Sequence, residues 1–300
     1  MTNDLLEALL RVNLVAAAAV AAVLLLRVPA RRLFGPEVAY GLWAAPPLAA
    51  LATLIPAPVD SDAAAGGLAG AAADLSAPLL LAWAAGAASA VAFLAWTQAR
   101  FMAAARAGKA GPAVVGVVTP RIVMPAEEGV FTPEERELIR AHERTHIARC
   151  DPRAGALAAA FQALCWFNPF VHLGVRAMRL DQELACDAAV LRDRPRDRAL
   201  YARTLLKSQL TAQGLPLGCY WPAGGRHPLE VRVGALAARG RRDDSLAGPL
   251  LLASAILASA WSGWRMNPPD PPPAAMVEFW KTQHKPVMSV ILVQAPARQP

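Results

Sequence analysis

Charged and aromatic residues are scarce in this sequence of 300 residues. Asp, Glu, Lys and Arg make up 18% of it and aromatic residues 6%, whereas hydrophobic residues make up 55%. The mean hydropathy is +0.32. This composition excludes an ordinary soluble domain of this size and predicts a membrane protein.

Cysteine is scarce as well, and no CxxC pair occurs. The four cysteines fall at irregular intervals, at Cys150, Cys165, Cys186 and Cys219. This pattern excludes a dense disulfide framework and favours reduced thiols in a cytoplasmic compartment. The net charge of +7 could indicate nucleic-acid binding. Basic residues also collect on cytoplasmic loops of membrane proteins, so we favour that explanation and expect no direct nucleic-acid partner.

The sequence contains several long apolar runs. A membrane-spanning helix needs about 20 mostly apolar residues. Four stretches approach or meet that length, at Leu9–Leu26, Val38–Ile55, Leu79–Trp96 and Pro249–Trp264. The second contains Pro46-Pro47, which should kink it. We therefore predict a mainly α-helical, polytopic membrane bundle of about four spans.

The distribution of charge between the spans predicts their orientation. Arginines lie between the first two spans, whereas aspartates lie between the second and third, which places the first connection in the cytoplasm. The expected organisation is a membrane domain with three spans (1–99), a cytoplasmic domain (100–246), a fourth span (247–264) and a Pro-rich tail outside (265–300). The N-terminus is expected outside as well. The tail is expected to be weakly ordered, although Val287–Val293 could form one strand.

A metal-binding motif lies on a helix expected to run from Pro133 to about Cys150. Thr132 should cap this helix, with Glu135 completing a capping box. His142-Glu143-Arg144-Thr145-His146 places two imidazoles one turn apart on one face, where they can hold one metal ion. This HExxH arrangement predicts a metallopeptidase with Glu143 beside the metal-bound water. The alternative is a pair of exposed histidines on a polar helix.

A third ligand is expected from a later helix. Metzincins would have a glycine and a third histidine where Arg149 and Pro152 stand, so that class is excluded. Glu183 and Asp187 lie one turn apart. Glu183 can therefore ligate the metal while Asp187 accepts a hydrogen bond from the other ring nitrogen of a ligating histidine. The alternative is a solvated acidic patch balanced by nearby arginines.

The sequence resembles the BlaR/MecR-type antirepressor metallopeptidases of bacteria over roughly Leu9 to Trp264. The likeness is carried by the HExxH motif, Trp166-Phe167-Asn168-Pro169, Glu183-Leu184-Ala185-Cys186-Asp187, the stretch Gly116–Pro125 and the predicted spans. The resemblance implies a gluzincin fold in a bacterial cytoplasmic membrane and one zinc ion per chain.

The roles that the resemblance implies fall on the same residues. His142, His146 and Glu183 would be the zinc ligands, Glu143 the general base and Asp187 a residue that orients a ligand. In such receptors a signal received outside activates proteolysis of a DNA-binding repressor. No penicillin-binding sensor domain is expected after the fourth span, so direct β-lactam sensing through an acylated serine is not expected.

Other residues receive weaker expectations. Tyr201 is a candidate oxyanion donor, although a packed tyrosine is the favoured interpretation. His172 is expected to be a packed histidine and Cys186 an apolar filler. Two short strands, Val114–Val118 and Ile122–Met124, could accept substrate as an added strand or simply pack on the helix. Ala154–Phe167 is expected to dip towards the membrane.

These observations predict a membrane zinc endopeptidase that acts on a protein substrate, such as a cytoplasmic repressor or a membrane-proximal protein. Two alternatives are a zinc-binding signalling scaffold without turnover and a quality-control protease of membrane proteins. The intact Glu143 argues against the scaffold, because a degenerate enzyme would be free to lose its base. Membrane lipid is an expected partner, and a homo-oligomer is left open.

Overall fold

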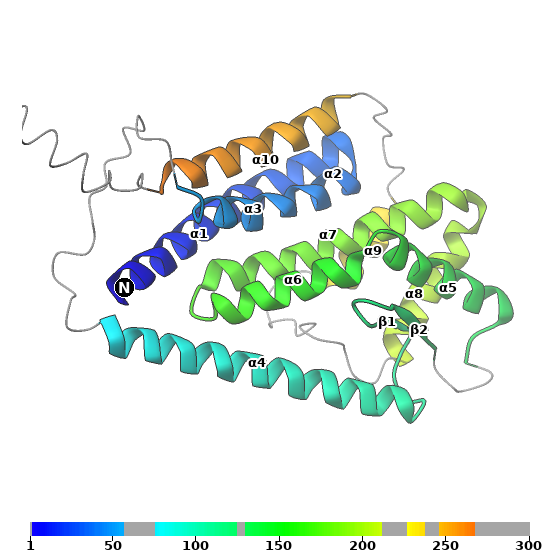
Figure 1. The fold of residues 1–300 in the computed structure, drawn as a ribbon. Helices are drawn as coiled ribbons and strands as arrows, with labels where there is room; N and C mark the ends of the chain where they lie inside the picture. Colours follow the sequence, from blue (N-terminus) through cyan, green and yellow to red (C-terminus); the bar gives the residue numbers. More distant parts are fainter. Residues whose placement is uncertain (1, 57–75, 125–129, 212–226, 238–245, 268–300) are drawn as a thin grey trace, which may run out of the picture.

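The computed structural model describes residues 2–56, 76–124, 130–211, 227–237 and 246–267, and these are mainly helical (Figure 1). The elements are α1 (Thr2–Phe34), α2 (Pro36–Gly41), η1 (Leu42–Ala44), α3 (Ala45–Ala52), α4 (Ser76–Arg106), β1 (Ala113–Val115), β2 (Arg121–Val123), α5 (Pro133–Ala148), α6 (Asp151–Leu164), α7 (Pro169–Asp193), η4 (Pro195–Asp197), α8 (Arg198–Thr211), α9 (Pro228–Ala237) and α10 (Ala247–Arg265). The predicted helical class with a small β element is confirmed. The predicted strand Val287–Val293 lies outside the described residues.

Within the described residues, three helices are long and apolar enough to cross a membrane: α1, α4 and α10. They contain the first, third and fourth predicted spans. Only Ser76 and Phe101 are buried along the 31 residues of α4, so its apolar surface faces outward, as that of a lipid-facing helix does. Helix α4 also continues through residues 99 and 100, where the sequence predicted a domain boundary.

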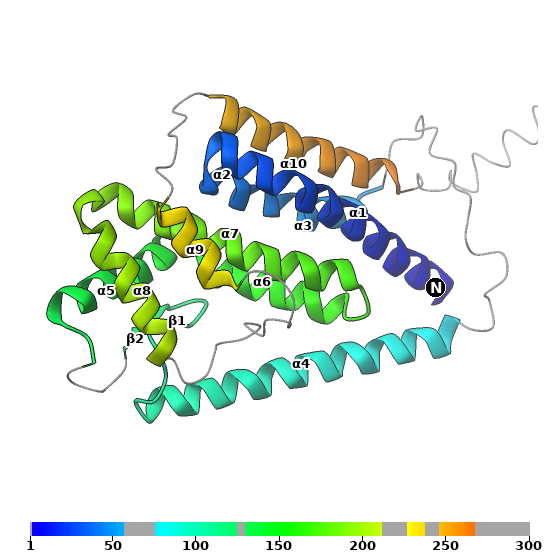
Figure 2. The ribbon, with the colours of Figure 1, turned by 180° about the vertical axis from the view of Figure 1, so that it is seen from behind.

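The second predicted span is built from shorter pieces. Helices α2 and α3 follow each other through the 3₁₀ turn η1, which ends just before Pro46-Pro47. The two prolines lack the N–H groups that would continue the preceding helical turn, which explains the predicted break. Helix α3 packs against both α1 and α10 (Figure 2). A Cβ on Gly263 of α10 would lie 2.2 Å from the Ala49 carbonyl oxygen, so this close approach requires glycine.

The arginines assigned to the first connection belong to α1 instead. Arg27, Arg31 and Arg32 lie near the C-terminal end of this helix of 33 residues. At 1.5 Å per residue α1 is about 50 Å long, which exceeds the roughly 30 Å of the hydrocarbon core. Its end can therefore project from the bilayer towards the rest of the chain. The aspartates between the second and third spans lie outside the described residues.

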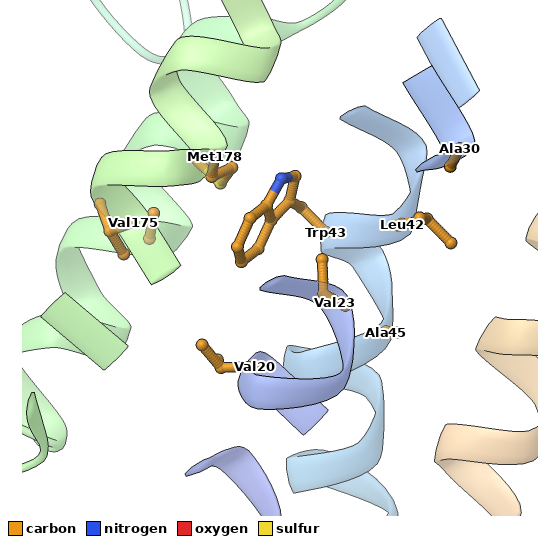
Figure 3. Packing of buried hydrophobic residues seen from close by; sticks show 9 residues of the cluster. Val20, Val23, Ala30, Leu42, Trp43, Ala45, Val175 and Met178 are labelled. Carbon is orange, nitrogen blue, oxygen red and sulfur yellow. The ribbon is translucent and has the colours of Figure 1, made fainter. Parts of the chain in front are cut away.

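Helices α6 and α7 form a hairpin that lies between α4 and the group formed by α1, α3 and α10 (Figures 1 and 2). Trp43 fills the space between α1 and α7, where it packs with Val20, Val23, Val175 and Met178 (Figure 3). At the hairpin tip, the Asn168 side chain donates to the Asn13 backbone oxygen of α1 at 3.0 Å. Helix α6, predicted to dip towards the membrane, therefore runs beside the membrane-type helices.

The strands form a two-stranded antiparallel hairpin that packs against α5. Its register pairs Ala113 with Val123 and Val115 with Arg121. The first strand is shorter than predicted, because Gly116 has a φ of 95° and turns the chain before Val117. The hairpin therefore lies beside the helix that carries the HExxH motif.

Candidate metal centre

Helix α5 presents the HExxH motif from a well-defined start. The Thr132 hydroxyl accepts from the Glu135 backbone N–H at 3.2 Å, and the Glu135 carboxylate accepts from the Thr132 N–H at 2.9 Å. The predicted capping box is thus confirmed. Leu138 and Ile139 bury one face of the helix, and Glu143 is buried as well. This packing fixes the rotation of α5 and with it the direction of both histidines.

The Nε2 atoms of His142 and His146 point at each other and lie 3.0 Å apart. The Glu183 carboxylate of α7 faces the same point, with Oε2 3.4 Å from His142 Nε2 and Oε1 3.5 Å from His146 Nε2. The structure therefore brings together the two imidazoles and the carboxylate that the sequence proposed as ligands. The imidazoles are 13% and 12% exposed and the Glu183 side chain 32%, which leaves the centre open on the Glu183 side.

The outer ring nitrogens determine which atoms face the centre. His146 Nδ1 lies 2.7 Å from Asp151 Oδ2, a group that can only accept while it is ionised. His142 Nδ1 lies 2.7 Å from the Tyr201 hydroxyl, which itself donates to Asp187 Oδ1 at 2.7 Å. Both Nδ1 atoms therefore carry the proton, and both Nε2 atoms of the neutral rings present a lone pair.

Two lone pairs and a carboxylate that meet in this way fit a bound cation. Without one, two neutral rings would bring their lone pairs together at 3.0 Å, so one ring would have to take a second proton. Burial opposes that proton, but Glu183 and Asp151 outweigh burial and raise the pKa of His146 to about 10. A cation between the rings takes the place of this second proton. Ligand bonds of about 2.0 to 2.1 Å in a tetrahedral zinc site place ligand atoms about 3.3 Å apart, which is close to the separations present here. The donor set, two imidazoles and one carboxylate, suits zinc.

Cys186 also belongs to this cluster. Its Sγ lies 3.4 Å from His142 Nδ1, and the side chain is fully buried. The ligand atoms of His142, His146 and Cys186 all lie within 4.8 Å of one another, so the described residues offer a possible His-His-Cys metal group beside the His-His-Glu one. The thiol interacts with both imidazoles. Cys186 therefore has a closer role than the expected apolar filler.

Asp187 and Tyr201 contact the site differently from the prediction. Asp187 Oδ1 lies 3.6 Å from His142 Nδ1, and the Tyr201 hydroxyl bridges the two groups. Asp187 thus orients His142 through Tyr201 and does not bond it directly. The Tyr201 hydroxyl lies behind the His142 ring, so its position favours this bridging role over the expected oxyanion role.

Arg232 of α9 ties the acidic residues together. Its Nε and Nη2 donate to both oxygens of Asp187 at 2.8 and 2.7 Å, and its Nη1 lies 2.8 Å from Glu183 Oε2. The side chain is 8% exposed. A planar guanidinium that engages a carboxylate with two parallel hydrogen bonds fixes both the charge and the orientation of that carboxylate.

The sequence model of a family described as BlaR1 peptidase M56 matches residues 7–74 and 59–236 of the chain. This chain belongs to the BlaR1 peptidase M56 family. Among the M56-related proteins, the regulatory protein BlaR1 of Bacillus licheniformis is 30% identical over 81 residues, which are 27% of this chain and 14% of that protein.

The methicillin resistance mecR1 protein of Staphylococcus aureus is 31% identical over 101 residues, 33% of this chain and 17% of the relative. The mecR1 protein of Staphylococcus epidermidis matches to the same extent. The alignments thus span less than a fifth of these relatives. No solved structure matches the chain.

Burial and neighbouring charges shift the pKa values of the two glutamates in this M56 site. Burial raises the pKa of Glu143, and the two imidazoles only partly offset this effect. A carboxylate shifted upward is better suited to accept a proton near neutral pH. Burial also acts to raise the pKa of Glu183, but Arg232 and the imidazoles outweigh it and hold that pKa well below its ordinary value. Glu183 is therefore ionised, as a ligand must be.

Two residues of the M56 site escaped the sequence analysis. Asp151 follows the helix predicted to end at about Cys150 and was given no role in the site, yet it accepts from His146 across a turn in which Cys150 has a φ of 60°. A carboxylate five residues after the second histidine was a usable signal. Arg232 is 45 residues from Asp187 and one of many arginines, so no local pattern distinguished it. His172, by contrast, contacts Gln162 and the Trp166 oxygen in the α6–α7 hairpin, as a packed histidine does.

Proposed function

We propose that this chain is a membrane-bound zinc endopeptidase of regulated proteolysis. The observation that carries the proposal is the convergence of His142 Nε2, His146 Nε2 and the Glu183 carboxylate within 3.5 Å of one another. Membership of a peptidase family and the three apolar helices support it.

His142, His146 and Glu183 would hold the ion. When bound, zinc lowers the pKa of a water molecule towards about 7 and polarises the carbonyl of the peptide. Asp151 and Tyr201 accept the Nδ1 protons and so keep both Nε2 lone pairs directed at the ion. Arg232 keeps the Glu183 carboxylate ionised and fixed.

Glu143 is the proposed general base. Its carboxylate would take the proton of the attacking water and return it to the nitrogen of the leaving amine. Glu143 is buried, which limits the access of bulk water to its carboxylate. The raised pKa of Glu143 suits both halves of this transfer, since the group must accept and then release the proton.

The proposed substrate is a cytoplasmic or membrane-proximal protein, including a transcriptional repressor. The arginines at the end of α1 favour the cytoplasm for the side of the membrane on which the site lies. The relative of Bacillus licheniformis is named a regulatory protein. This support comes from the name of a relative and from the position of the arginines. A separate experiment is therefore needed to identify the substrate.

The test compares four forms of the full-length protein purified in detergent. We expect about one zinc per chain in the unchanged protein and in Glu143→Gln, which also loses about 100- to 10,000-fold in peptide-bond cleavage. Glu183→Ala should lose zinc and cleavage together. His172→Gln, a histidine away from the centre, should retain both.

Substrates are identified by comparing new protein N-termini in cells that carry the unchanged or the Glu143→Gln form. N-termini present only with the unchanged protein identify its cleavage sites, and a site in a DNA-binding protein supports the repressor assignment. A protein without metal, or cleavage unaffected by Glu143→Gln, refutes the proposal. Zinc binding with no difference between the two sets of N-termini favours the scaffold.

A further inference from the structure

Helix α2, which lies in the second predicted span, contacts the Asp151 carboxylate, and Asp151 in turn orients a proposed zinc ligand. The Tyr40 hydroxyl of α2 donates to Asp151 Oδ1 at 3.0 Å, while Asp151 Oδ2 accepts from His146 Nδ1 at 2.7 Å. Asp151 is 4% exposed. Each of its oxygens thus has its own hydrogen-bond donor, Tyr40 for Oδ1 and His146 for Oδ2, and Arg149 Nε lies 3.6 Å from Oδ2.

The direction of the Tyr40 hydrogen bond is fixed by a third residue. Gln182 Nε2 donates to the Tyr40 oxygen at 2.9 Å and also approaches the Asp151 backbone oxygen at 3.5 Å. Because a backbone oxygen only accepts, the amide must present its NH₂ group to both atoms. The proton of Tyr40 is then left for Asp151.

The same segment is anchored to α7 one turn later. Trp43 Nε1 donates to Asp181 Oδ2 at 2.9 Å, and Asp181 also pairs with Arg27 and Arg31 of α1 at 3.4 and 3.2 Å. The Trp43 ring lies in the apolar cluster between α1 and α7 (Figure 3). Tyr40 is therefore held at a defined position relative to both α6 and α7.

We propose that Tyr40 is a positioning residue for His146, acting through Asp151, and that α2 thereby sets how tightly the metal is held. This inference rests on the proposed function, since it assigns Tyr40 a role towards an ion held by His142, His146 and Glu183. Without the hydroxyl, Asp151 Oδ1 is buried without that donor, and the carboxylate is held only through Oδ2, by His146 and Arg149. Its orientation towards Nδ1 is then less well defined. The imidazole then loses its fixed tautomer and ring angle.

The experiment measures metal binding in the full-length protein in lipid nanodiscs. Tyr40→Phe should release zinc to a chelator about tenfold faster than the unchanged protein and should shift the visible absorption of the cobalt-substituted site. The matched control is Trp83→Phe, because Trp83 of α4 donates to the Leu164 oxygen at the other end of α6 at 2.8 Å. It also removes a donor from a membrane-type helix to α6, and its zinc release should stay within twofold of the unchanged protein.

A double-mutant cycle tests the route through Asp151. In an Asp151→Asn background, Tyr40→Phe should add less than a twofold change. An equal effect in both backgrounds, or zinc release by Tyr40→Phe within twofold of the unchanged protein, overturns the inference. If Tyr40→Phe does not fold, Gln182→Leu replaces it, with faster zinc release expected and an unchanged rate refuting the role. An unchanged protein that binds no metal would refute the proposed function itself, a separate outcome.

Discussion

His142 and His146 lie one turn apart on the same helix, yet their outer ring nitrogens contact different parts of the chain. The Nδ1 of His142 reaches Tyr201 of α8, and behind it Asp187 and Arg232 of α9. The Nδ1 of His146 reaches Asp151 at the start of α6, and behind it Tyr40 of α2. His142 is thus oriented by residues of α7, α8 and α9, and His146 by residues of α6 and α2.

The difference shows that two equal ligands can have unequal dependence on the rest of the fold. The His142 side is a buried polar network whose members are all charged or hydroxylic, so it is costly to break. The His146 side extends through Asp151 and Tyr40 to a segment that is itself made of short helices. The His146 side is therefore the more adjustable one.

The largest expected effect breaks the His142 side. Arg232→Met leaves Asp187 and Glu183 without their shared guanidinium, so the free energy of unfolding should fall by about 3–5 kcal/mol. Denaturant unfolding in detergent measures it. Arg144→Met is the control, since Arg144 pairs with Glu137 at 3.3 Å with 61% of its side chain exposed and should cost no more than about 1 kcal/mol. An equal loss for both variants would contradict the description of Arg232.

The second effect breaks the His146 side. Asp151→Asn replaces an ionised acceptor with a neutral amide beside His146 Nδ1, so zinc affinity should fall by about 10- to 100-fold. Competition with a chromogenic chelator measures it. Asp193→Asn, at the end of α7, serves as a carboxylate control and should leave affinity within twofold. Affinity of Asp151→Asn within twofold of the unchanged protein would show that His146 does not depend on this acceptor.

A smaller loss of zinc affinity is expected from a change on the His142 side. Tyr201→Phe removes the hydroxyl between His142 and Asp187, and zinc affinity should fall by about tenfold, the low end of such effects. Asp187 Oδ1 is already 3.6 Å from Nδ1 and can approach to replace the lost acceptor. Adding Asp187→Ala to Tyr201→Phe should therefore lower affinity further. A Tyr201→Phe protein with a normal metal site but no turnover would instead support the oxyanion role.

The smallest expected effect is a loss of stability in α5, the helix that carries both histidines. Thr132→Ala removes the N-cap of α5, which carries both ligands, and should cost about 1 kcal/mol of stability. Thermal unfolding measures it, and Thr132→Ser should recover most of the loss. Because the cap lies about two and a half turns before His142, the cobalt spectrum should be unchanged. A changed spectrum would mean that helix fraying reaches the metal site.

The local features of the site were predictable from the sequence, because they depend on spacing along one helix. The cap at Thr132 and the shared face of His142 and His146 follow from the order of residues along α5. Glu183 lies on another helix, and it was proposed as a ligand from its spacing to Asp187 and from the family resemblance. The long apolar runs likewise predicted α1, α4 and α10. The broken second span followed from its two prolines, although the resulting short helices did not.

Contacts between distant segments were not predictable in the same way. Arg232 reaches Asp187 across 45 residues, and Tyr40 reaches Asp151 across 111. A buried arginine and a solvated one look alike in a single sequence. The arginines at the end of α1 were likewise interpreted as loop charges, whereas Arg27 and Arg31 face the buried Asp181. Tertiary packing decides such pairings, and no periodicity reports it.

Asp181 and Glu183 stand two residues apart on one unbroken helix. Asp181 pairs with Arg31 of α1 and accepts a hydrogen bond from Trp43, and Glu183 faces the imidazoles. A helix is stiff over two residues, so a displacement of Asp181 also moves Glu183. Distances between a metal and its ligands vary by only about 0.2 Å. Sliding α1 by half an ångström would therefore move the third ligand by more than coordination tolerates. Such a shift would be enough to disrupt the proposed metal site.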